Sequence, residues 1–239
     1  VKWGGVFSQA EYSNGMLSAF FNVSGSNSAY KRIAYFKKKD DSQYASTDWK
    51  WIRGYTVKTG ANLNLDEYNN VFFNTGYISK APKFSNIYTE SNTLQAYIRN
   101  EKVKAIEGGY SYRSSLFSAN VNAYYTAWEN KPSNGGVTVM VDDVPYRANI
   151  NGMNALHKGI EMDFSYRILN NLSVEGLLSL GDWQWTSADT VRFLDDNNNP
   201  ITDDFGNEII ASFDADGVHV GDAAQTQVGS SIRYEPTPN

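Results

Sequence analysis

The sequence predicts an all-β fold: an antiparallel, up-and-down sheet of about nine strands that forms a segment of a transmembrane β-barrel. Three observations lead to this prediction. Candidate strands alternate apolar and polar residues, short and long connections alternate between them, and aromatic residues gather near the strand ends. The chain has no run of about 18 apolar residues, so the sequence offers no candidate helical membrane span.

The stretch FSANVNAYYTAW, Phe117–Trp128, shows the alternation most clearly. Every second residue from its first phenylalanine is small and apolar or aromatic, whereas Ser118, Asn120 and Asn122 occupy the other face. A period of two residues indicates a half-buried strand. About 9 to 11 tilted residues cross a bilayer, and Phe117–Ala127 fits that length.

The same pattern recurs along the chain, and no convincing amphipathic helix interrupts it. Turn signals such as SNG at 13–15 and ILNN at 168–171 separate successive strands into hairpins. We expect strands at Trp3–Tyr12, Leu17–Ser24, Trp49–Asn62, Val71–Ile78, Lys102–Tyr112, Phe117–Trp128, His157–Arg167, Leu172–Leu180 and Val220–Tyr234.

The lengths of the connections alternate strictly. Tight turns follow the first, third, fifth and seventh strands, and long stretches follow the others, at 25–47, 79–100, 129–156 and 186–217. Such long loops are uncommon in compact soluble domains, but outer-membrane barrels carry long extracellular loops and short periplasmic turns. This orientation places Leu116 at a periplasmic turn and Trp128 at the outer mouth.

The two faces of each strand then have different surroundings. The apolar register faces lipid, and the other register, rich in Asn, Ser, Gly, Thr and Gln, lines a lumen. A polar outer surface of a soluble sandwich is the alternative interpretation of the second face. Tyrosines near the strand ends of the apolar register fit an aromatic girdle: Tyr12, Tyr55, Tyr77, Tyr125, Tyr166 and Tyr234.

The amino-acid composition limits the kinds of site and partner that the protein can have. The 239 residues include no cysteine and carry a formal charge of −5, so disulfides and thiolate metal sites are excluded and nucleic acid is not an expected partner. The mean hydropathy of −0.49 does not argue against a membrane barrel, whose lumen and loops are polar. The chain opens and closes next to strands without a signal pattern, so we expect residues 1–239 to be one partial barrel domain of a larger protein.

Three segments carry family motifs in order. The stretch 70–88 contains a strand followed by the pattern G-[FY]-x-x-A-P-x-x-x-x-[LI]-Y, matched by Gly76, Tyr77, Ala81, Pro82, Ile87 and Tyr88. The stretch 100–131 is similar to a hairpin with P-E-K and E-x-G followed by YYT-W, although Asn100 stands where Pro is usual. The stretch 154–185 is similar to a hairpin that begins G-[VI]-E, matched by Gly159, Ile160 and Glu161. Together they resemble TonB-dependent outer-membrane receptors, particularly those of Bacteroidetes-type bacteria.

The resemblance implies a closed barrel of roughly 22 strands, of which this chain supplies about nine. It implies location in the bacterial outer membrane and TonB-driven uptake of a siderophore, cobalamin, glycan or peptide. The implied partners are outer-membrane lipid, a plug domain and remaining barrel of the same protein, the TonB complex, an unidentified small-molecule or oligomeric ligand and, as an option, a surface lipoprotein. We expect no plug domain within this chain.

Catalysis has little support. His157 and His219 are far apart and neither accompanies a triad-type Ser or Asp motif, so a loop-edge polar role is the simpler interpretation of both. No glycine-rich loop precedes a helix, which removes the usual nucleotide site. We therefore expect a protein that is not an enzyme and holds no cofactor. A structural Ca²⁺ ion in a long loop is the one exception that the sequence suggests.

The acidic stretch DDNNNP, Asp195–Pro200, offers hard oxygen ligands. Asp195, Asp196, Asn197 and Asn199 are the candidate ligands of a structural Ca²⁺ ion. Pro200 stands where an EF-hand loop needs glycine, and a final acidic ligand is missing. A solvated acidic surface loop is the simpler interpretation, with a calcium-stabilised loop as the alternative.

Three tryptophans form the candidate ligand site. Trp128, Trp183 and Trp185 continue the lumen register beyond the bilayer, so we expect them to converge near the outer mouth. Their rings could stack on a sugar or another large planar ligand. Packing of the loop roots is the simpler interpretation. Besides active transport, two other functions stay open: a passive porin-like barrel and a soluble secreted sandwich that binds carbohydrate.

Overall fold

The computed structural model describes residues 1–35, 46–88, 94–95, 97–141, 144–195, 199–221 and 223–236. Nine strands form a single antiparallel sheet in the order β1-β2-β3-β4-β5-β6-β7-β8-β11, and β9 and β10 form a separate two-stranded sheet. The elements are β1 (Lys2–Ser13), β2 (Leu17–Tyr30), β3 (Lys50–Asn64), β4 (Asn69–Lys80), the 3-10 turn η2 (Phe84–Asn86), β5 (Glu101–Arg113), β6 (Phe117–Val141), β7 (Val144–Leu169), β8 (Leu172–Trp185), β9 (Ala188–Arg192), β10 (Ile210–Asp214) and β11 (Thr226–Tyr234).

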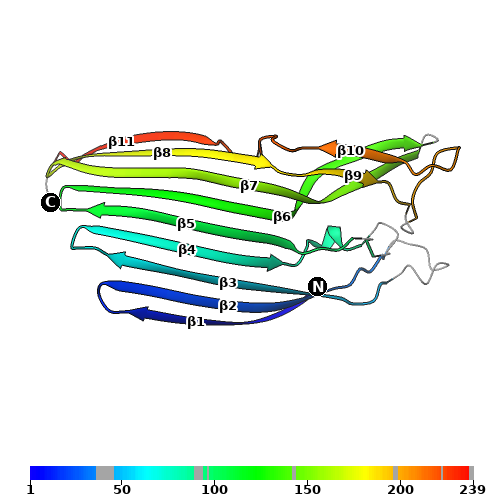
Figure 1. Cartoon of the computed structure of the whole chain (residues 1–239), viewed down its shortest axis with the longest axis horizontal. Helices are drawn as coiled ribbons and strands as arrows, with labels where there is room; N and C mark the ends of the chain where they lie inside the picture. The colour runs from blue at the N-terminus through cyan, green and yellow to red at the C-terminus, as the bar shows by residue number, and fades with distance from the viewer. Residues whose placement is uncertain are drawn as a thin grey trace.

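All nine expected strands are present and each pairs with its neighbour in sequence. Figure 1 shows the short turns at one end of the sheet and the long connections at the other. The predicted up-and-down, antiparallel architecture is therefore confirmed. Among the described residues, no helix has both the length and the apolar character that a membrane span requires.

Side chains close the short turns and thereby fix the register of the hairpins. Asn14 Oδ1 accepts hydrogen bonds from the Met16 and Leu17 amides at 3.2 and 2.8 Å, and Gly15 supplies the left-handed φ of +86°. In the β3–β4 turn, Asp66 Oδ1 accepts the amides of Tyr68 and Asn69 at 2.8 Å. Asn and Asp favour such turns because their short side chains bond nearby backbone.

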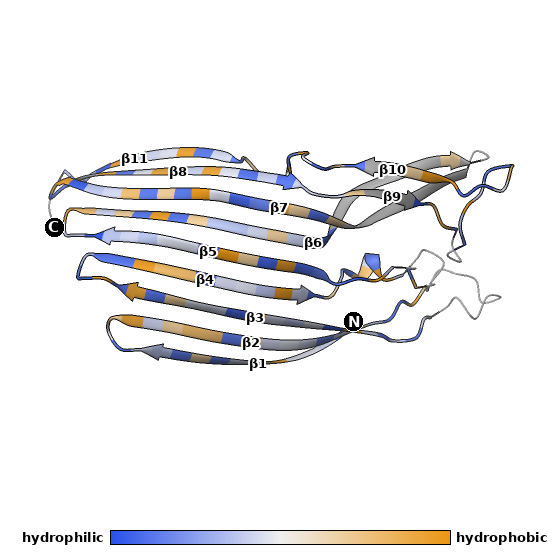
Figure 2. Ribbon diagram, viewed as in Figure 1, coloured by the Kyte–Doolittle hydropathy of each residue, from blue (hydrophilic) through white to orange (hydrophobic). Residues whose placement is uncertain are grey.

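The registers align the apolar positions of all nine strands on one face. The row through Val121, for example, pairs it with Tyr110 of β5 and Met162 of β7, and Met162 with Leu178 of β8. Figure 2 shows the alternation of apolar and polar residues along the strands. This aligned face consists of side chains that no second layer covers in the described chain.

The other face is polar and holds several close approaches between aromatic rings and glycines. A Cβ atom at Gly109 would lie 2.4 Å from the Phe72 ring, and one at Gly60 would lie 2.6 Å from the Phe20 ring. Both rings lie across the neighbouring strand because glycine leaves the space. Small residues at these positions thus let large rings lie flat on the lumen side.

Buried apolar residues gather at the long-loop end, and mid-strand side chains stay exposed. The buried set is Ala29, Ile87, Tyr88, Met153, Ala155, Phe193, Ile201, Ala215 and Val220. By contrast, Phe73 and Ile106 in mid-strand are 53% and 49% exposed. A soluble sandwich would bury such residues against a second sheet, so this arrangement favours a face that meets lipid.

Two predicted connections differ in the structure. The stretch 129–156, expected to be a long loop, is largely strand, because β6 and β7 continue past the sheet as a two-stranded ribbon (Figure 1). The stretch 186–217 contains the β9–β10 hairpin, and the last strand begins at Thr226 rather than Val220.

Candidate functional site

The outer end of the lumen face is built by β6, β7 and β8. In the register, Trp128 lies opposite Ala155, which lies opposite Trp185, and one row lower Thr126, His157 and Trp183 are aligned. The three tryptophans expected to converge do so, in two adjacent rows of the same face. Their convergence is a consequence of strand pairing, because residues aligned across strands share a face.

His157 joins two of the tryptophans into an aromatic stack. Its ring lies 5.2 Å from the Trp183 ring at an interplanar angle of 15°, and 6.0 Å from the Trp128 ring at 44°. The sequence alone indicated a loop-edge polar role for His157. Its position opposite Thr126 and Trp183 places it in this cluster, and that position follows only when the exact pairing of β6, β7 and β8 is known.

Trp183 is held on both its ring and its backbone. Its Nε1 donates a 2.8 Å hydrogen bond to the Tyr124 hydroxyl, and its amide donates to Gln225 Oε1 at 3.0 Å. The Val220 amide donates to the Trp183 carbonyl at 2.9 Å. Hydrogen bonds with Tyr124 and with the segment that precedes β11 therefore fix the position of Trp183.

Trp128 and Trp185 face a common cation. Lys131 Nζ lies 5.3 Å from the centre of each ring, within the range of cation–π attraction. The bulge between Trp128 and Lys131 brings the lysine back over the rings, and Asn130 adopts the left-handed φ of 56° there. Trp128 Nε1 is buried and has no hydrogen-bond partner among the described residues. All three tryptophan side chains remain partly exposed.

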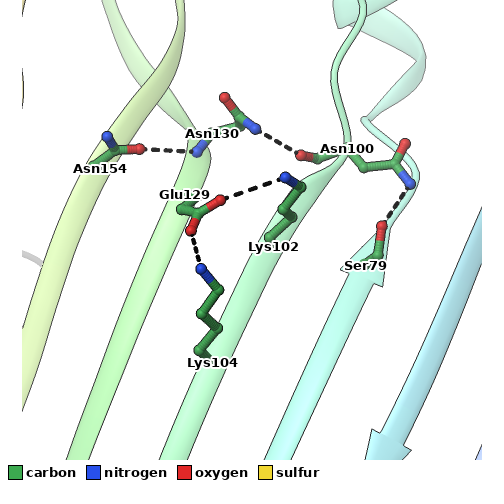
Figure 3. A network of polar contacts seen from close by, with 7 residues as sticks. All are labelled: Ser79, Asn100, Lys102, Lys104, Glu129, Asn130 and Asn154. Atoms are coloured by element: carbon green, nitrogen blue, oxygen red, sulfur yellow. Dashed lines mark hydrogen bonds and ion pairs between the residues drawn. The ribbon is translucent and has the colours of Figure 1, made fainter.

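An amide network joins the outer ends of the strands beside this cluster (Figure 3). Asn100 Nδ2 donates to the Arg53 carbonyl at 2.7 Å and to Ser79 Oγ at 2.9 Å. Asn130 Nδ2 donates to the Asn100 carbonyl at 3.0 Å, and the Asn130 amide donates to Asn154 Oδ1 at 3.3 Å. The residue that replaces the usual proline therefore links β3, β4 and β6.

Glu129 lies at the centre of the same view and pairs with two lysines. Lys102 Nζ lies 3.5 Å from one carboxylate oxygen, and Lys104 Nζ contacts the other. The hydrogen bond from Lys104 lowers the pKa of Glu129 below its ordinary value of 4.5. Burial opposes this shift, and the attraction of Lys104 and Lys102 adds to the lowering. Glu129 is therefore ionised at neutral pH.

The Ile87 and Tyr88 positions of the first family motif anchor the β4–β5 connection. Ile87 is fully buried, and the Tyr88 hydroxyl donates to either of two carbonyls, that of Tyr30 at 2.7 Å and that of Asp48 at 3.1 Å. The Tyr30 hydroxyl in turn donates to the Pro82 carbonyl at 3.2 Å. The motif thus ties the β4–β5 connection to the ends of β2 and β3.

Two described residues of the acidic stretch, Asp195 and Asn199, bond to each other. Asp195 accepts the Asn199 amide at 2.8 Å through Oδ1 and the Asn199 side-chain amide at 3.0 Å through Oδ2. Asp196 and Asn197 lie outside the described residues. Within the described chain no group of three acidic, His or Cys side chains is arranged to hold a metal ion. The calcium loop stays a prediction.

The same turn is built a second time eight residues later. Asp203 accepts the Asn207 amide at 2.8 Å and its side-chain amide at 3.1 Å, and these bonds, the side-chain one first, lower the pKa of Asp203. Three backbone hydrogen bonds close the two turns into a ring: Ile201 to Phe193, Ile209 to Ile201 and Phe193 to Ile209. We call residues 193–195 and 199–209 the two-turn cap. Its repeat was visible in the sequence as the spacing of Asp195 from Asp203 and of Asn199 from Asn207.

Comparison with known proteins identifies the fold. The similar solved structures include the copper transporter OprC, with a TM-score of 0.57 and 10% identity, and the FrpB iron transporter from Neisseria meningitidis (F3-3 variant), with 0.56 and 13%. They cover 80% and 97% of this chain, which spans only 31% and 38% of theirs. No curated protein matches the chain. The family model described as TonB dependent receptor-like, beta-barrel matches residues 2–236. The chain belongs to the TonB-dependent receptor-like β-barrel family.

Proposed function

We propose that this chain forms part of the barrel wall of an outer-membrane receptor that takes up a scarce, bulky nutrient with energy delivered through TonB. One observation carries the proposal: a nine-stranded sheet exposes an aligned apolar face and has short turns at one end and long connections at the other. Family membership supports the same function. The plug, the remaining strands and the TonB contact belong to this proposal as parts of the whole receptor.

The ligand would meet the aromatic cluster of Trp128, His157, Trp183 and Trp185. Partly exposed indole rings on a rigid β framework suit a ligand with flat or ring-shaped surfaces, such as a sugar, a corrin or an aryl siderophore. Lys131 adds one cation beside two of the rings. The similar proteins are named as copper and iron transporters, which is compatible with a metal-bearing cargo but does not select it.

The proposal is tested with the full-length receptor in cells with and without a working TonB system. The probes are labelled ferric siderophores, cobalamin, oligosaccharides and peptides. We expect one of them to bind the cell surface in both strains and to enter only where TonB works. Entry that persists without TonB would instead establish the passive porin-like function.

The ligand site is tested by Trp128→Ala and Trp183→Ala in the same receptor. Loss of a stacking ring is expected to weaken surface binding of the identified probe by about threefold to tenfold. Trp51→Ala is the matched control, because Trp51 is 54% exposed on the lipid-facing register. Equal affinity of all three variants and the wild type would leave the cluster with a packing role only.

A further inference from the structure

The charges on the lipid-facing register are distributed unevenly. Throughout the nine described strands of the large sheet, charged residues on this register occur only at the long-loop end, beyond the apolar rows. They comprise five bases and two acids, although acids outnumber bases in the chain as a whole, at 26 to 21. The set is Lys2, Arg53, Lys102, Lys104, Lys158, Glu129 and Asp182.

Tyrosines mark the border between the apolar rows and these charges. Lys104 lies opposite Tyr77, and Lys158 lies opposite Tyr125. Tyr55 stacks on Tyr77 with ring centres 5.6 Å apart. Tyrosine rings of membrane barrels lie at the level of lipid headgroups. On the proposed orientation, the lysine ammonium groups therefore lie at the headgroup level of the outer leaflet.

The β5–β6 part of this border has more positive than negative charge. In the described chain Lys102 and Lys104 share the carboxylate of Glu129 (Figure 3). Their side chains are 41% and 55% exposed. The next pair, Lys158 and Asp182, is balanced, with a separation of 3.1 Å. Two ammonium groups on one carboxylate leave one positive charge and several N–H donors directed to the surface.

The opposite end of the same face has no such charges. There the register holds aromatic and aliphatic residues next to the short turns, among them Tyr112, Phe117, Tyr166 and Tyr234. A role in strand pairing alone would not restrict charges to one end of the sheet. The asymmetry matches a membrane whose two leaflets present different headgroups.

We propose that Lys102 and Lys104, next to Glu129, bind a phosphate group of an anionic lipid headgroup in the outer leaflet. The proposal rests on the membrane orientation given under Proposed function. Ammonium groups attract phosphate as point charges, and their bonds strengthen at the edge of an apolar layer. Glu129 has two effects: it holds the lysines in place and partly neutralises them.

The test uses the purified full-length receptor in detergent with added lipid A, in its bisphosphorylated and its fully dephosphorylated forms, with bound lipid counted by native mass spectrometry. Each basic residue near an anionic surface contributes about fivefold to affinity. The double variant Lys102→Gln/Lys104→Gln should therefore retain at least about fivefold less bisphosphorylated lipid. Retention of the dephosphorylated lipid should not change.

Two further variants separate lipid binding from strand pairing. Glu129→Gln frees both lysines and should retain more bisphosphorylated lipid than the wild type, whereas a purely structural ion pair predicts no gain. Lys58→Gln removes one positive charge from the lumen register; it is the control for position and should behave as the wild type. Inorganic phosphate should not compete at matched concentration, because it lacks the acyl chains.

The proposal is overturned if the lysine double variant retains both lipids as the wild type does, or if Glu129→Gln retains no more. Uptake of the nutrient probe is measured on the same variants. Normal TonB-dependent uptake together with unchanged lipid retention would reject the headgroup site and leave the transport function in place. Loss of membrane insertion by the wild type would reject the orientation itself.

Discussion

At the scale of single residues, the sequence predicted that the three tryptophans lie together, but it did not predict that His157 and Lys131 lie beside them. Trp128, Trp183 and Trp185 could be placed together because a period of two and the strand order determine the face of each residue. His157 and Lys131 could not, since their positions depend on an exact register and on a bulge after Trp128. A one-residue shift reverses the face of every later side chain.

The assignment of the two faces is testable at neighbouring positions of β6. Ala123 lies on the lipid register between Gly108 and Ile160, and Asn122 lies on the lumen register opposite Glu161. Ala123→Arg in the full-length receptor should impair membrane assembly by about 2–4 kcal/mol, the cost of arginine near the bilayer midplane. Asn122→Arg should assemble better, because an arginine there can pair with Glu161. Heat-modifiable mobility on gels measures assembly. Equal loss at both positions would contradict the assignment of the two faces, and a larger loss at Asn122 would show that they are reversed.

At the scale of elements, strands with one apolar face could be predicted and the structured parts of the loops could not. The stretch 129–156 is rich in Asn, Gly and Pro, which indicates a loop, yet backbone pairing holds it as a ribbon. The alternation of apolar and polar residues that identified the other strands is missing here, so the sequence did not indicate strands in this stretch. The last strand begins later than predicted for another reason. The Val220 amide donates a hydrogen bond to the Trp183 carbonyl before the chain enters β11.

The two-turn cap supplies a prediction at this scale. Asp203→Ala removes the carboxylate that accepts hydrogen bonds from the backbone amides of Phe205 and Asn207 and from the Asn207 side-chain amide. We expect faster cleavage of residues 199–209 by an added protease on intact cells, with unchanged membrane assembly. Asp204→Ala, the same charge change in an exposed neighbour, is the control.

Calcium enters the same assay as a second variable. If a Ca²⁺ ion stabilises the stretch Asp195–Asn199, a chelator should accelerate cleavage of the wild-type cap, and added Ca²⁺ should reverse the effect. Cleavage that does not respond to the chelator would show that hydrogen bonds alone hold the cap. Cleavage of Asp203→Ala at the wild-type rate would contradict the role given to its carboxylate.

At the scale of the whole molecule, the sheet has two unpaired edges, β1 and β11, and exposed apolar side chains on both. Val6 of β1 and Val228 of β11 are 77% and 76% exposed. Edges of this length are sites of further strand pairing. The alternation of short and long connections predicted this architecture because it shows at which end of the sheet each connection lies. Amino-acid composition carries no such information.

Residues 1–239 expressed by themselves should therefore require detergent to stay monodisperse. Without detergent, the apolar face and the two edges should drive association, as seen by light scattering and size-exclusion chromatography. The full-length receptor in detergent is the control. A soluble monomer with a cooperative melt and no detergent would contradict the membrane assignment and favour the secreted sandwich.

The asparagine network has a mechanical consequence for the mouth of the barrel. Its links run sideways, from Arg53 and Ser79 through Asn100 and Asn130 to Asn154, and the Asn154 amide continues to Ser187 Oγ at 3.1 Å. Because these hydrogen bonds join neighbouring strands, a force that pushes one strand end outward is shared by the strands bonded to it. We therefore expect the spacing of these strand ends to be maintained when the connections beyond them move.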